Sequence, residues 1–199
     1  MSKPKIGIIV GSTRANRFAD QPAEWIAKIA AEHADLDFEI LDLRDYPLPF
    51  YEEATSLAWA PAKNPVALRW QDKVRSLDGF VVIAAEYNHG PTAVLKNAFD
   101  YAFSEWNNKP VAFVGYGGAG AVRAVEQLRQ VAIEVQMAPI RNAVHILLPD
   151  FVAVLQQGRK LEEFEHLNQS ANAMLAQLSW WAHALKSARD ADGRAAQAA

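Results

Sequence analysis

Short apolar runs alternate with amphipathic stretches along most of this chain. The first run, residues 6–10, is continuous and ends at Gly11, which is typical of a parallel strand buried on both faces. After it, Ala19, Ala23, Ile26 and Ala30 recur at helical spacing. The pattern predicts strands over 6–10, 38–43, 80–85, 111–114 and 143–148, and helices over 18–33, 65–77, 119–136 and 161–186, with one more beginning near Pro91.

Five strands that alternate with helices predict an α/β fold built on a doubly wound parallel sheet. We expect one domain over residues 1–186, followed by a small, polar and flexible tail over 187–199. Ligands of such sheets bind beyond the carboxyl ends of the strands, where the strand order reverses. The loops after the first, third and fourth strands are therefore the expected functional loops.

Composition excludes several classes of function. The net charge of −3 provides no strong basic field for nucleic acid or an anionic membrane, and no apolar run approaches the roughly 20 residues of a membrane span. Without cysteine there is no disulfide, thiolate nucleophile or cysteine-bound metal, which fits a cytoplasmic protein. The five histidines show no ligand spacing on a predicted helix, so we expect no metal site.

The loop after the first strand, residues 11–17, has the composition of a phosphate site. It places two hydroxyl groups, Arg14 and Arg17 beside free backbone N–H groups at a helix N-terminus. It matches neither GxxxxGK[ST] nor GxGxxG, since Gly11 is its only glycine. The alternative is a polar turn in which Ser12 or Asn16 caps the helix and the arginines are solvated.

The loops after the third and fourth strands suit a flat heteroaromatic ligand. In the first of these, Tyr87 can contact a ring, and Gly90 allows the backbone to come close. Residues 115–120 then contain four glycines, which permit a similar approach. The structural alternative for the loop after the third strand is a tight turn that positions the following helix, and for the glycine-rich loop it is a flexible turn.

Two motifs resemble those of the NADPH-dependent FMN reductase family. They are Gly11-Ser-Thr-Arg14 with Phe18, and the run Glu86-Tyr-Asn-His-Gly-Pro-Thr-Ala-Val-Leu-Lys-Asn-Ala-Phe-Asp100. The resemblance spans residues 4–180 and implies a flavodoxin-like three-layer sandwich, with a five-stranded parallel sheet of order 2-1-3-4-5 and helices on both faces. The chain departs from the family at Arg17-Phe18-Ala19, where many members have Ser-Phe-Asn, and at Ala85, where proline is common.

The resemblance also implies the cofactor site, with FMN and NAD(P)H as cofactors. The first loop would hold the FMN phosphate, the second would contact the isoalloxazine, and the glycine-rich loop would lie beside the ring and ribityl chain. No residue is expected to be catalytic, since the cofactor carries the chemistry, and His89 is expected to be a loop contact. The cofactor-binding residues predicted in this way are Ser12, Arg14, Arg17, Phe18, Ala19, Glu86, Tyr87, Asn88, His89, Gly115, Tyr116, Gly117 and Gly118.

The function implied is an oxidoreductase that passes hydride from NAD(P)H through FMN to quinones, with flavin, chromate and azo compounds as other acceptors. A flavodoxin-type electron carrier is an alternative, although the chain lacks the strong acidity and the T-x-T-G-x-T loop of flavodoxins. A flavin-dependent redox sensor is another. The aromatic stripe Leu95, Ala98, Phe99, Ala102, Phe103 and Trp106, with Trp180 and Trp181, also suits the interface of a homodimer or homotetramer.

Overall fold

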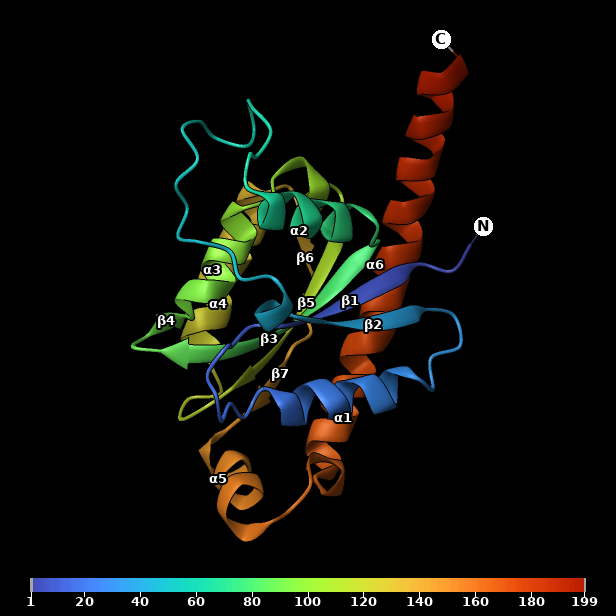
Figure 1. Cartoon of the computed structure of the whole chain (residues 1–199). Coiled ribbons are helices and arrows are strands. Elements are labelled where there is room, and N and C mark those ends of the chain that lie inside the picture. Colours follow the sequence, from blue (N-terminus) through green and yellow to red (C-terminus); the bar gives the residue numbers. More distant parts are fainter. Residues whose placement is uncertain (1, 199) are drawn as a thin grey trace.

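A twisted sheet lies at the centre of the computed structural model, which describes residues 2–198 and the side chains as far as residue 193 (Figure 1). Its order is β2-β1-β3-β5-β6, with β7 also paired to β5 and β4 to β3. All pairs are parallel except β3–β4. The strands are β1 (Lys5–Val10), β2 (Asp37–Asp42), β3 (Gly79–Tyr87), β4 (Gly90–Pro91), β5 (Pro110–Tyr116), β6 (Ala138–Pro139) and β7 (Val144–Ile146).

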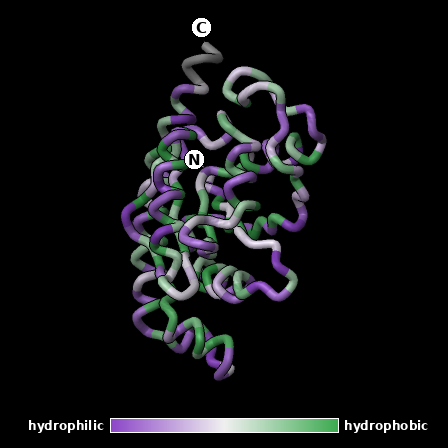
Figure 2. Tube along the Cα trace, turned by 90° about the vertical axis from the view of Figure 1, so that its left-hand side faces the viewer, coloured by the Kyte–Doolittle hydropathy of each residue, from purple (hydrophilic) through white to green (hydrophobic). Residues whose placement is uncertain are grey.

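Helices cover both faces of the sheet, as the alternating pattern predicted. Helices α1, α5 and α6 contribute to one apolar core, and α2, α3 and α4 to the other. Hydrophobic and hydrophilic residues alternate along the helical parts of the trace (Figure 2), because each helix buries only one side. The helices are α1 (Asp20–Ala30), α2 (Pro65–Arg75), α3 (Ala93–Asp100), α4 (Val122–Glu134), α5 (Leu148–Gln157) and α6 (Glu165–Ala198), with 3-10 turns η1 (Leu43–Asp45), η2 (Ser104–Trp106) and η3 (Leu161–Glu163).

The edge of the sheet differs from the prediction of one fifth strand. Two short strands, β6 and β7, occupy that position along β5. Pro139 has no N–H to donate, which limits pairing at β6, and β7 ends before Leu148 because α5 begins there. The order 2-1-3-4-5 is otherwise confirmed, with the last position divided between two strands.

Helix α5 is absent from the helices that the sequence pattern predicted. Its signals were nevertheless present, since Pro149 lies in the first turn and Gly158 follows the last one with φ of 70°. Helix α6 also continues past Lys186, where the flexible tail was expected to begin. Arg189 donates to the carboxylate of Asp78 and to the carbonyl of Asn108, so this part of the predicted tail is attached to the domain.

The aromatic stripe is a core feature rather than an exposed interface. Trp106 is fully buried, and its ring contacts those of Trp70, Phe80 and Phe99. The indole N–H groups of Trp70 and Trp106 donate to the carbonyls of Ala98 and Phe99, so both aromatic side chains are also satisfied as donors. Of the two tryptophans in α6, Trp180 is exposed and Trp181 is half-buried.

Candidate functional site

The loop between β1 and α1 begins at a glycine that no other residue could replace without a shift. A Cβ atom on Gly11 would lie 2.6 Å from the carbonyl oxygen of Ile83 and 2.9 Å from Leu95. The N–H of Gly11 donates to that Ile83 oxygen, and its carbonyl accepts a 2.5 Å hydrogen bond from the hydroxyl of Thr92. The same hydroxyl accepts from the N–H of Leu95 and caps α3. Thr92 therefore joins the first loop to the helix that follows the second.

Arg17 lies beneath the first loop, although the resemblance implied a contact with phosphate. Its guanidinium group is almost fully buried and donates to Asp20, to Asp42 and to the carbonyl of Ser12. The hydrogen bond to Asp42 is the main reason that the pKa of Arg17 is raised, while burial acts in the opposite direction. The guanidinium N–H groups of Arg17 therefore donate to protein acceptors rather than to a ligand.

The outer side of the loop keeps donors for a ligand. Within the part of the chain that the structure describes, the backbone N–H groups of residues 12–16 donate to no protein acceptor. They precede α1, whose N-terminus adds the positive end of a helix dipole. Arg14 is exposed at the rim of this loop. Free N–H groups beside an exposed guanidinium group form a suitable site for a phosphate.

The second loop is the turn of a tight hairpin between β3 and β4. Glu86 pairs with Pro91, and Tyr87 with Gly90, which leaves Asn88 and His89 as the two turn residues. Both have positive φ, 50° and 78°, as a type I′ turn requires. The side chains of Tyr87, Asn88 and His89 are exposed, whereas the carbonyl of His89 accepts from Gln127 of α4.

Glu86 is directed into the protein rather than towards a ligand. Its carboxylate forms an ion pair with Arg123 and accepts hydrogen bonds from the backbone N–H groups of Arg123 and Ala124 at the start of α4. Burial acts to raise the pKa of Glu86, but these hydrogen bonds outweigh it and hold the pKa below its ordinary value. Glu86 therefore anchors the hairpin to α4.

The glycine-rich loop after β5 is open where a ring would need space. A Cβ atom on Gly117 or on Gly118 would meet nothing within 4 Å, whereas one on Gly115 would lie 2.3 Å from the carbonyl oxygen of Gly120. Gly117 also has φ of 132°, which favours glycine. Gly115 is therefore required for packing, and the other two glycines leave space for close approach.

Three of the predicted residues lie in the core beneath these loops. Ala19 is fully buried, and the ring of Phe18 packs against Tyr116 and Phe151 with centroids 5.2 and 4.6 Å apart. Burial raises the pKa of Tyr116 to about 12, so its hydroxyl keeps its proton at neutral pH. These side chains support the loops from below.

A cleft of about 530 Å³ opens beside the first loop. Ser12 and Tyr87 meet at its edge, with 3.0 Å between their hydroxyl oxygens. Sequence reasoning missed its other side, where the Asn97 amide donates to the carbonyl of Pro49. The missed lining residues are Leu48, Pro49, Phe50, Thr92, Ala93, Val94 and Asn97, and only Thr92, Ala93, Val94 and Asn97 lay within a recognised motif.

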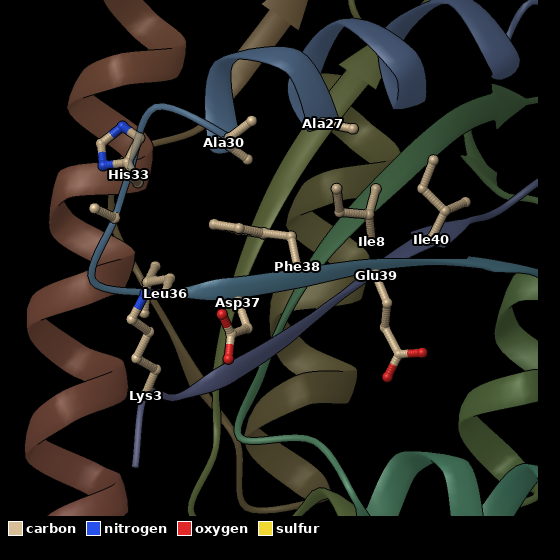
Figure 3. A pocket seen from close by; sticks show the side chains of 12 residues that line it. Lys3, Ile8, Ala27, Ala30, His33, Leu36, Asp37, Phe38, Glu39 and Ile40 are labelled. Carbon is tan, nitrogen blue, oxygen red and sulfur yellow. The ribbon is translucent and has the colours of Figure 1, made fainter. Parts of the chain in front are cut away.

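Another hollow, of about 490 Å³, lies between α1 and the outer strand β2 (Figure 3). The figure shows Ile8 and Ile40 facing α1, while Asp37 and Glu39 point to the other side of the strand. This hollow lies along the amino-terminal half of β2 and so away from the loops described above. Among the described residues there is no group of three or more potential metal ligands, and no helix is long and apolar enough to cross a membrane.

Fold and site together define a class of protein. An open parallel sheet, with a loop of free backbone N–H groups after β1 and an aromatic hairpin after β3 at the reversal of strand order, is typical of flavodoxin-like mononucleotide-binding proteins. The residues present fit FMN, since the free N–H groups of residues 12–16 suit its phosphate and the space above Gly117 and Gly118 suits its ring.

Comparison with known proteins agrees with this class. The family model for NADPH-dependent FMN reductases matches residues 4–147. An NAD(P)H-dependent FMN reductase of Schizosaccharomyces pombe is 34% identical over 145 residues, which are 71% of this chain and 72% of that protein. A 2-hydroxy-1,4-benzoquinone reductase of Burkholderia is 31% identical over 134 residues, 64% of this chain and 69% of that protein. The flavoenzyme FerB, an NAD(P)H:(acceptor) oxidoreductase from Paracoccus denitrificans, has the same fold, with a TM-score of 0.69, 23% identity, and coverage of 88% of this chain and 97% of its own.

The chain belongs to the NADPH-dependent FMN reductase family. It is therefore an FMN-dependent NAD(P)H oxidoreductase, which confirms the family, the fold and the cofactors that the resemblance implied.

Proposed function

We propose that this chain reduces quinone-like acceptors at the expense of NAD(P)H, with FMN held between the three loops described above. The observation that carries the proposal is the combination of a loop with free backbone N–H groups after β1 and an open, glycine-lined loop after β5, with β3 between the two strands. The quinone reductases among its relatives support the choice of acceptor. When bound, FMN supplies the two-electron transfer between the nicotinamide and the acceptor.

The residues of the chain bind and orient in this scheme. Arg14 and the N–H groups of residues 12–16 hold the phosphate dianion, while Tyr87 and Asn88 lie at the edge of the ring position. Gly117 and Gly118 let the backbone approach the ring closely. The cleft beside Tyr87, lined in part by Leu48, Pro49, Phe50 and Val94, excludes water from a flat acceptor that stacks there.

The oligomeric state and the location of the protein also belong to the proposal. The exposed aromatic side chains of Phe50, Trp59 and Trp180 support self-association as a homodimer or homotetramer, since large apolar side chains at a surface favour contacts between proteins. The absence of cysteine from the sequence supports a cytoplasmic location.

A spectroscopic and kinetic experiment tests the function. The purified chain should bind FMN, show the absorbance of a bound flavin, and oxidise NADH or NADPH when a benzoquinone is present. A protein that stays colourless after FMN is added would refute the flavin site. A flavin-bound protein that oxidises neither nicotinamide would instead be an electron carrier or a redox sensor.

Arg14 provides the test of the phosphate assignment. Replacing Arg14 with alanine should weaken FMN binding by about 1.5–3 kcal/mol, the range for a hydrogen bond that involves a charged group. The affinity is measured by titrating FMN fluorescence, with Arg69→Met as a control because Arg69 is also exposed and lines a different hollow, beside Tyr46 and Lys73. Equal FMN affinity in the wild type and Arg14→Ala would contradict the assignment.

A further inference from the structure

The carbonyl groups of the first loop accept hydrogen bonds from two arginines, one buried and one exposed. Arg17 donates from Nη1 to the carbonyl of Ser12 at 2.6 Å. Arg44, which follows β2, donates from Nη2 to the carbonyls of Arg14 and Ala15. Three carbonyls within four residues are thus bound to guanidinium groups, which come from two segments distant in the sequence.

Because peptide units are planar, the contacts to these carbonyl groups also orient the N–H groups that follow them in the loop. In a trans peptide, the C=O of one residue and the N–H of the next point in opposite directions, and no peptide bond in the described residues is cis. Fixing the carbonyls of Ser12, Arg14 and Ala15 therefore directs the N–H groups of Thr13, Ala15 and Asn16 away from the two guanidinium groups. These N–H groups are among those that donate to no protein acceptor in the described part of the chain.

Asp42 contacts the guanidinium group of Arg17 and the backbone of Arg44. Its carboxylate accepts from Arg17, with contacts of 2.7 and 2.5 Å, and from the backbone N–H of Arg44 at 2.9 Å. Asp20 accepts from the other side of the Arg17 guanidinium group. Burial acts to raise the pKa of Asp42, but the hydrogen bonds from Arg17 and Arg44 hold it below its ordinary value, so the carboxylate stays charged at neutral pH.

We propose that Arg17 and Arg44, fixed by Asp42, are positioning residues that turn the N–H groups of the first loop towards the flavin phosphate and so select phosphorylated flavin. The inference rests on the proposed function and assigns the phosphate to those N–H groups and to Arg14. It changes the role of Arg17, which the resemblance placed among direct contacts. It adds Arg44 and Asp42, which no motif indicated.

The test compares FMN with riboflavin, which has the same ring and ribityl chain but no phosphate. Arg44→Met should weaken FMN binding about 10- to 100-fold, the scale of hydrogen bonds to a charged group, and leave riboflavin binding unchanged. Arg69→Met, which removes the same charge elsewhere, should alter neither affinity. FMN affinity equal to wild type in Arg44→Met, or an equal loss for both flavins, would overturn the proposal.

Asp42→Asn decides the role of Arg17 by the sign of its effect. Removing a negative charge near a phosphate strengthens anion binding by electrostatics alone, and a freed Arg17 that contacted the phosphate would strengthen it further. A positioning role predicts the opposite, namely weaker FMN binding with riboflavin binding unchanged. FMN affinity that is equal to or tighter than wild type would overturn it. If the wild-type protein binds no FMN, the proposed function fails, which is distinct from failure of this inference.

Discussion

Replacing Thr92 with valine should destabilise the domain because one hydroxyl group joins two loops. The side chain is buried, donates to the carbonyl of Gly11 and accepts from the N–H of Leu95. Valine has nearly the same shape, so the change leaves no large cavity. Losing the cap on α3 costs about 1 kcal/mol, and leaving the buried Gly11 carbonyl without a donor costs about 1–3 kcal/mol. The free energy of unfolding should therefore fall by about 2–4 kcal/mol.

Urea unfolding of the flavin-free protein, followed by tryptophan fluorescence, measures this change. Thr92→Ser is the matched control, because it keeps both hydrogen bonds and loses only a methyl group, at a cost of about 1 kcal/mol. The reasoning predicts that valine is clearly worse than serine. A valine variant as stable as the serine variant would show that the link between Gly11 and α3 contributes little.

Three further substitutions test other parts of the structure by urea unfolding. His89→Gly should stabilise the protein by about 1 kcal/mol, since glycine suits the positive φ of a type I′ turn; a less stable variant would contradict the turn assignment. The pKa of Glu86 is lower in the folded protein than the ordinary value of 4.5, so the ionised carboxylate stabilises the fold above pH 4.5 and this stabilisation is lost as the pH falls through the folded-state pKa. In Glu86→Gln, the free energy of unfolding should therefore fall less steeply as the pH is lowered through the acid range. Burial lowers the pKa of Lys109 from 10.5 to about 8, so the unfolded state binds more protons between these values and stability rises with pH there. Relative to Lys109→Met, the wild type should gain about 3 kcal/mol over that window, and a constant difference would show that Lys109 titrates normally.

Much of the fold follows from local pattern. Buried parallel strands are continuous apolar runs, and the helices between them repeat at helical spacing, so the main strands could be predicted from residues 6–148 alone, while their order was implied by the family resemblance. The predicted elements differ from the structure where contacts between distant segments set the end of a strand or helix. The edge strand divides at Pro139, and α6 continues to Ala198, with Arg189 held by Asp78.

Part of the site also follows from the sequence. Gly11, Arg14 and a turn at Asn88 could be predicted, because a glycine after a strand, an arginine beside a helix N-terminus and a short polar turn have local physical causes, whereas the pairing of β3 with β4 on either side of that turn could not. The sequence thus predicted which segments are candidates to hold a phosphate and a ring.

Only the tertiary structure decided what each side chain in those segments does. Arg14 and Arg17 are three residues apart and have the same charge, yet Arg14 is exposed at the rim while Arg17 is buried against Asp42 of another strand. Glu86 likewise pairs with Arg123, which is 37 residues away. A charged side chain pairs with an opposite charge that is close in space. The order of the strands brings β2 and α4 beside these loops, and it therefore determines which charges are close enough to pair.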